Sequence, residues 1–123
     1  MYQDYKDLVK MYVVYVREAH AADSSWPVPY AKELNITEPK EYEERCGVAE
    51  RLVKEGKLTI PCLIDGMDNA VNDLYKGHPT RIFLIRKDGK LGVAGSRGPF
   101  GLIPSMEAAE KWLKEYKSTG KEL

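Results

Sequence analysis

The run from Met11 to Val16 constrains the fold of this chain more than any other stretch. It holds six consecutive apolar or aromatic residues, three of them β-branched valines, and charged residues lie on both sides of it. A run so short and so apolar predicts a strand buried on both faces, as in parallel sheets that are covered by helices. The sequence therefore favours an α/β fold, in which ligands bind beyond the carboxyl ends of the strands.

Glu18 and His20 follow this run, where the carboxyl end of the strand is expected. Side chains two positions apart on an extended backbone point to the same side, so the carboxylate could orient the imidazole and raise its basicity. The alternative interpretation is a surface glutamate and histidine at a strand exit. The spacing by itself leaves both interpretations open.

Composition excludes several classes of protein. The 123 residues suffice for one domain, expected over residues 1–123, and 19 basic residues balance 19 acidic ones, which argues against a nucleic-acid binder. No apolar run reaches the length of a membrane span and no signal peptide follows Met1, so a soluble, cytoplasmic protein is expected. The two cysteines, Cys46 and Cys62, are far apart, so neither a disulfide framework nor a metal site is expected.

Helical patterns recur along the chain. A short amphipathic helix is predicted within residues 2–10, and a second helix is predicted from an N-cap at Thr37 to a terminator at Gly56. Further helices are expected over residues 68–75 and from an N-cap at Ser105 onward. The loop over residues 21–29 contains Trp26. Its ring could serve as a hydrophobic lid, but an anchor that holds the loop to the body of the protein is the favoured interpretation.

Strand patterns complete the outline. A second strand is predicted over residues 58–65, with Pro61 at its beginning because proline cannot donate to a strand ladder. Asp88-Gly89 lies between two apolar runs, a strong indication of a hairpin with strands over residues 81–86 and 91–94. The predicted architecture is a parallel strand pair followed by a carboxyl-terminal antiparallel hairpin, with flanking helices.

This order of elements, with Thr59-Ile60-Pro61 opening the second strand, resembles the thioredoxin fold after its first strand. Four segments resemble the iodothyronine deiodinase family, and the likeness runs through nearly the whole chain. These segments are Val14–Asp23, with its Tyr-x-x-Glu-Ala-His pattern, Asp65–Asn69, Arg81–Ile85 and Gly95–Pro99.

The resemblance implies roles for individual residues. Glu18 and His20 match the family's catalytic stretch, and Tyr15 and Arg81 match substrate-binding positions. Pro61 matches the cis-proline of the thioredoxin fold, so the Ile60–Pro61 bond is expected to be cis, a form that costs an X-Pro bond only about 0.5–1 kcal/mol.

The chain also departs from the family pattern. The family's nucleophile, a selenocysteine or cysteine, lies on a strand and loop before the first helix, and Met1 falls after that point. A second family histidine, expected within residues 34–39, is absent. Neither Cys46 nor Cys62 is placed as a substitute, and Cys62 is expected to be buried in its strand with a raised pKa.

Two functions follow. The first is a deiodinase-like redox protein of thioredoxin-like fold whose first strand is missing through truncation or a displaced start. It would carry out thiol- or selenol-dependent reductive dehalogenation or related reductase chemistry on a small aromatic, halogenated or thiol substrate. It would need an external thiol reductant and no bound cofactor, and the isolated chain is expected to be inactive. The alternative is a complete, non-catalytic thioredoxin-like module for binding or assembly.

The missing strand has a structural consequence. In the thioredoxin arrangement, we expect it to lie between the Met11–Val16 strand and the strand that Pro61 opens. Each unmet buried backbone group would cost about 1–3 kcal/mol, so the gap must close. Either the two strands pair directly, or a second copy supplies strand edges; the sequence interpretation favours a homodimer.

Overall fold

The computed structural model describes residues 1–123, which divide into two compact units. One unit consists of Met1–Lys10 together with Pro79–Leu123, and the other spans Met11–His78. Each unit contains its own two-stranded sheet and its own helices, which confirms the predicted α/β class. The expectation of a single domain over residues 1–123 stays a prediction.

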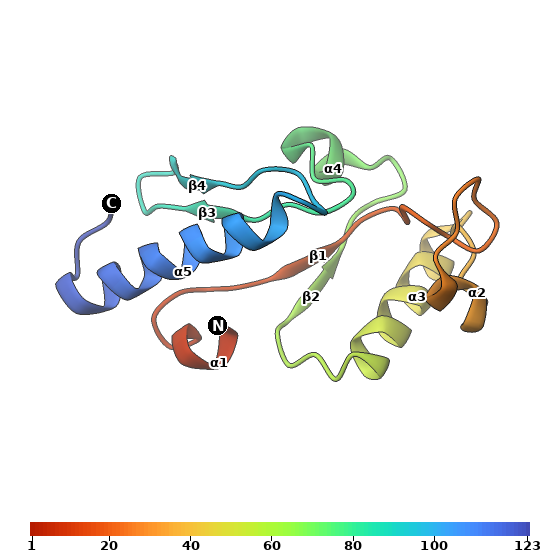
Figure 1. Ribbon diagram of the computed structural model, residues 1–123, viewed down its shortest axis with the longest axis horizontal. Coiled ribbons are helices and arrows are strands. Elements are labelled where there is room, and N and C mark those ends of the chain that lie inside the picture. Colours follow the sequence, from red (N-terminus) through yellow and green to blue (C-terminus); the bar gives the residue numbers. More distant parts are fainter. The chain divides into compact units, whose positions relative to one another are not determined.

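The Met11–His78 unit is built on a parallel strand pair (Figure 1). Strand β1 (Val13–Tyr15) pairs with β2 (Cys62–Ile64), and Val14 lies opposite Leu63. Helix α3 (Tyr42–Glu55) connects the two strands and packs against β2. Two shorter helices belong to the same unit. Helix α2 (Pro29–Glu33) precedes α3, and helix α4 (Ala70–Tyr75) follows β2.

Direct pairing of β1 with β2 is the first of the two ways in which the predicted gap could close. No gap lies between these strands, so a second copy of the chain is not needed to satisfy their facing backbone groups, and dimerisation stays a prediction. Burial of the first strand on both faces is wrong, because Val13 and Val14 are each 37% exposed. A two-stranded sheet with one packed helix leaves part of its apolar surface uncovered.

Pro61 lies where the strand pattern placed it, but its peptide bond differs from the expectation. Its carbonyl accepts a hydrogen bond of 3.0 Å from the Val13 amide, and β2 begins at the next residue. The one cis peptide bond of the chain is Gly98–Pro99, so the predicted cis Ile60–Pro61 bond is wrong. The energy difference between the isomers is about 0.5–1 kcal/mol, too small for the local sequence to decide.

The start of α3 was misplaced by the sequence pattern. Glu41 rather than Thr37 is the N-cap residue, and the Lys40 amide donates to Glu44 Oε2 over 2.9 Å. Ile36 and Pro39 are buried in the segment before the helix, so tertiary packing holds that segment in a non-helical path. The helix ends at Gly56 as predicted.

The second unit is organised around the predicted hairpin. Strands β3 (Phe83–Ile85) and β4 (Leu91–Ala94) are antiparallel, and Gly89 in the turn has a φ of 81°. This positive φ explains why glycine follows Asp88 in the turn. Helix α5 (Leu102–Thr119) packs against β4, and the short α1 (Tyr2–Tyr5) belongs to the same unit (Figure 1).

Helix α5 begins three residues before the predicted cap. Its N-cap residue is Gly101, and Ser105 is buried inside the first turns instead. Ser105 Oγ donates to the Gly101 carbonyl and accepts from the Ser96 amide over 3.0 Å. The serine therefore joins the helix to the preceding loop rather than starting the helix.

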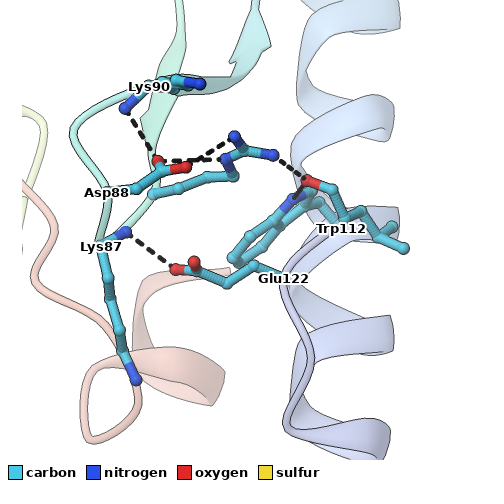
Figure 2. A network of polar contacts seen from close by, with 7 residues as sticks. Lys87, Asp88, Lys90, Trp112 and Glu122 are labelled. Carbon is cyan, nitrogen blue, oxygen red and sulfur yellow. Dashed lines mark hydrogen bonds and ion pairs between the residues drawn. The ribbon is translucent and has the colours of Figure 1, made fainter.

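Polar contacts join the hairpin turn, and α5 itself, to the last residues of the chain, which follow α5 (Figure 2). The Lys87 amide donates to Glu122 Oε1 over 2.9 Å, and Trp112 Nε1 donates to the Leu123 carbonyl over 3.4 Å. Within the turn, Asp88 accepts from the Lys90 amide over 3.0 Å.

None of the helices combines the length and the apolar composition needed to cross a membrane.

Candidate functional site

Tyr15 and Glu18 form the first contact of the candidate site, at the carboxyl end of β1. The Tyr15 hydroxyl donates a hydrogen bond to Glu18 Oε1. Burial of the phenol, followed by this hydrogen bond and the charge of Glu18, raises the pKa of Tyr15 far above its ordinary value of 10.0. Tyr15 therefore acts as a hydrogen-bond donor to the carboxylate rather than as a base.

His20 is oriented by a different group from the one expected. Its Nδ1 lies 2.8 Å from the Trp26 carbonyl oxygen, which can only accept, so in the neutral ring Nδ1 carries the proton and Nε2 the lone pair. The structure gives the Glu18 carboxylate a hydrogen bond from the Tyr15 hydroxyl, and it is the Trp26 carbonyl that holds the His20 imidazole. With this lone pair on Nε2, the half-buried His20 can act as a proton acceptor.

Trp26 anchors its loop through its backbone and not through its ring. The ring is 76% exposed, so the expectation that it packs into the body is wrong. It makes an edge contact with the His20 imidazole, with 5.2 Å between the ring centroids. An exposed aromatic ring thus lies directly beside the candidate base.

A cleft of about 440 Å³ opens in the Met11–His78 unit beside Glu18. Its charged and polar lining comes from the segment after β1, from the segment before α3, from α3 and from the segment after β2. The residues of this lining include Arg17, Glu18, Asp23, Glu38, Arg45 and Asn69.

Glu38 is a residue of this cleft that the sequence interpretation did not single out. Burial of its carboxyl, and next the charge of Glu18, raise the pKa of Glu38 above its ordinary value, whereas Arg45 and Arg17 act in the opposite direction. No local pattern marks Glu38, because it lies 20 positions from Glu18 in the chain. Only the folded chain brings the two carboxyl groups together.

Arg45 is the buried cation behind the cleft and is only 2% exposed. Its guanidinium donates to the carbonyls of Asp65 and Gly66 over 3.2 and 2.7 Å, and to Asn69 Oδ1 over 3.1 Å. Its Nε is buried and has no hydrogen-bond partner. A signal for this burial was present in the sequence, because Arg45 lies four residues before Ala49 on the buried stripe of α3.

Asp65 holds the segment after β2 in place. It is 2% exposed, and its two carboxylate oxygens accept from the Val71 and Asn72 amides over 3.0 and 2.9 Å. These amides belong to the first turn of α4, where they lack intrahelical partners. Asp65 therefore caps α4 although it is not the N-cap residue of that helix. Its backbone carbonyl also accepts a hydrogen bond from Arg45.

The contacts of the remaining predicted site residues are with groups outside the cleft. Arg81 belongs to the other unit, where its Nε donates to the Gly95 carbonyl over 2.8 Å and its guanidinium lies over the Phe83 ring, 4.7 Å from the centroid. Cys62 is half-buried in β2 rather than fully buried, and burial raises the pKa of its thiol, as expected. Pro61 contacts β1 through its carbonyl and does not line the cleft.

Comparison with known proteins agrees with the sequence segments singled out above. The family model of iodothyronine deiodinase matches residues 1–117. The type II iodothyronine deiodinase of Neoceratodus forsteri is 28% identical over 117 residues, which cover 92% of this chain and 42% of that protein. The thyroxine 5-deiodinase of Gallus gallus is 30% identical over 115 residues, covering 94% of this chain and 42% of that protein. The chain thus spans about two fifths of the length of these relatives.

Proposed function

The chain belongs to the iodothyronine deiodinase family, and from this membership we propose that it is the thioredoxin-like part of a thiol- or selenol-dependent reductase. The reaction proposed is reductive dehalogenation of a small aromatic substrate. In it, two thiol or selenol groups are oxidised to a disulfide or its selenium equivalent, the carbon–halogen bond breaks, halide leaves and the carbon gains a proton. Related thiol–disulfide chemistry would use the same groups.

The observation that carries this proposal is the arrangement at the carboxyl end of β1. His20 presents Nε2 as a proton acceptor and is fixed through Nδ1 by the Trp26 carbonyl. Glu18 is held by the Tyr15 hydroxyl. We assign His20 and Glu18 as the catalytic pair and Tyr15 as the residue that positions Glu18. Family membership alone, and not this arrangement, is the ground on which we also propose Tyr15 and Arg81 as substrate contacts. A nucleophilic thiol or selenol remains to be supplied, because the pKa of Cys62 is raised rather than lowered.

Iodide release from an iodophenol in the presence of dithiothreitol tests this function. The isolated chain is expected to release little or none. A longer product that includes the natural upstream coding sequence, if this encodes a cysteine or selenocysteine strand, is expected to release iodide and to lose this activity on His20→Ala. Exposed Glu107→Gln on α5 is the matched control that should keep it. Activity of the isolated chain that disappears in His20→Ala, or activity of the longer product that survives His20→Ala, would contradict the proposal.

A second candidate function is assembly without catalysis. The observation in its favour is the apolar surface left on the β1–β2 pair, where Val14 is 37% and Leu63 is 49% exposed. A second copy could cover this surface in a homodimer. Sedimentation at micromolar concentration distinguishes the candidates, since a well-folded monomer would rule out assembly through this surface.

A further inference from the structure

One edge of the β1–β2 pair carries backbone groups that no other strand uses. The Val13 amide donates to the Pro61 carbonyl over 3.0 Å. The Tyr15 carbonyl accepts from the Asp65 amide over 2.9 Å, so Val13 and Tyr15 direct their backbone groups toward β2. Successive residues of a strand direct these groups to opposite edges, so the N–H and C=O of Val14 point away from β2. The sheet has only two strands, so this outer edge of β1 is open.

The sequence around this edge does nothing to block it. Residues 11–16 contain no charged residue and no proline, the residues that commonly prevent an edge strand from pairing. The side chains of the run are also accessible, since Tyr12 is 54% exposed and Val13 and Val14 are each 37% exposed. An open, uncharged edge of valine and tyrosine is a template for pairing with another extended segment.

We propose that the outer edge of β1 pairs with the same edge of a second copy of this chain, as an antiparallel pair with a two-fold axis at Val14. Val14 then lies opposite Val14 of the second copy and exchanges both backbone hydrogen bonds with it. On either side, Val13 lies opposite Tyr15 of the second copy, and Tyr12 lies opposite Val16. This edge-to-edge contact differs from the coverage of the β1–β2 face considered above, and it does not rest on the reductase function.

The sequence favours this register over its neighbours. Every position from Tyr12 to Val16 meets an apolar or aromatic residue, and pairs of an aromatic with a β-branched side chain stabilise antiparallel strands. Two residues further out, Lys10 comes opposite Glu18 of the second copy, so opposite charges meet at both ends. A shift by two residues would instead oppose Val16 to Lys10, or Tyr12 to Glu18. This charge complementarity indicates a second copy as the occupant of the edge.

Disulfide cross-linking tests the register, in a background that carries Cys46→Ser and Cys62→Ser. Directly opposed Cα atoms of a hydrogen-bonded antiparallel pair lie about 5.5 Å apart, which a disulfide can span. Val14→Cys should therefore form a covalent dimer in the presence of oxidised glutathione. Val13→Cys is the matched control, because Val13 is equally exposed but two cysteines at this position would lie about 8 Å apart.

Leu63→Cys distinguishes the edge from the face. In the edge-to-edge pair the two Leu63 positions are separated by three strand spacings, about 14 Å, so this variant should stay monomeric on a non-reducing gel. Absence of a covalent dimer in Val14→Cys would overturn the proposal. Cross-linking of Val13→Cys or Leu63→Cys as fast as that of Val14→Cys would overturn it too.

Sedimentation keeps the test decisive if the cysteine variants disturb the fold. Wild type is expected to sediment as a reversible dimer at micromolar concentration. Tyr12→Lys adds a charge to the edge and should raise the dissociation constant of the dimer about tenfold or more. Leu74→Lys adds the same charge at an exposed position of α4 and should leave this constant unchanged. A monomeric wild type, or an unchanged constant in Tyr12→Lys, would overturn the proposal. Neither experiment measures iodide release, so each fails independently of the reductase function.

Discussion

Asp65→Asn is the substitution whose effect the structure predicts most directly. In the wild type, Oδ1 accepts from the Val71 amide and Oδ2 from the Asn72 amide, at a residue that is 2% exposed. The N-cap residue of α4, Asn69, makes no side-chain capping bond, so Asp65 satisfies the helix in its place. An asparagine retains one acceptor oxygen and turns an N–H₂ group toward the other backbone amide.

The expected loss of stability follows from these contacts. A hydrogen bond to a charged group contributes about 1.5–3 kcal/mol, and a buried amide without a partner costs about 1–3 kcal/mol. Both values describe the loss of the same contact, so they are not added in full. Loss of a negative charge at a helix start adds about 0.3–1 kcal/mol. Together these give about 3 kcal/mol for Asp65→Asn. Asp68→Asn is the matched control at the same helix end, because Asp68 is exposed and accepts only one amide bond, of 3.2 Å, so about 1 kcal/mol or less is expected.

Urea unfolding followed by circular dichroism measures this difference. With an m-value of about 1–3 kcal/mol/M, a loss of about 3 kcal/mol lowers the unfolding midpoint by roughly 1–3 M. Hydrogen exchange should report faster exchange at the Val71 and Asn72 amides in Asp65→Asn, and not in Asp68→Asn. Equal unfolding free energies for the two variants, within about 0.5 kcal/mol, would refute the capping role of Asp65.

Four further predictions concern other parts of the chain. Because burial raises the pKa of Cys62, iodoacetamide at neutral pH should label it more slowly than a free cysteine, measured in Cys46→Ser; faster labelling would contradict this. Gly95→Ala should destabilise the protein by about 1–3 kcal/mol, because its Cβ would lie 2.6 Å from a backbone carbonyl. At Gly47, in the middle of α3, an added Cβ would meet no atom within 4 Å beyond its own helix. Gly47→Ala should therefore stabilise the protein by about 0.5–1 kcal/mol, and a loss of stability would show that helix propensity does not decide this position. Since the folded pKa of Glu38 is raised, its contribution to stability is present below the ordinary value of 4.5 and is lost as pH rises through the folded pKa. The unfolding free energy of wild type minus that of Glu38→Gln should therefore fall over this window, and a flat difference would argue against the raised pKa.

The sequence by itself determined the local elements of this protein. The apolar run that contains β1, the Asp88-Gly89 turn and the helix stop at Gly56 are all present in the structure. Each depends on residues within a few positions of one another, through alternation, a required positive φ or the end of a helical stripe. The four segments that resemble the deiodinase family are likewise stretches of contiguous sequence, and the family membership agrees with them.

Only the tertiary structure decided which groups satisfy one another. Glu18 is held by Tyr15, and the Trp26 carbonyl takes the role that the spacing suggested for a carboxylate. Arg45 reaches acceptors 20 to 24 residues away, and Glu38 comes to face Glu18. Several partners of similar hydrogen-bonding strength compete for each polar group, so the choice among them depends on the path of the folded backbone.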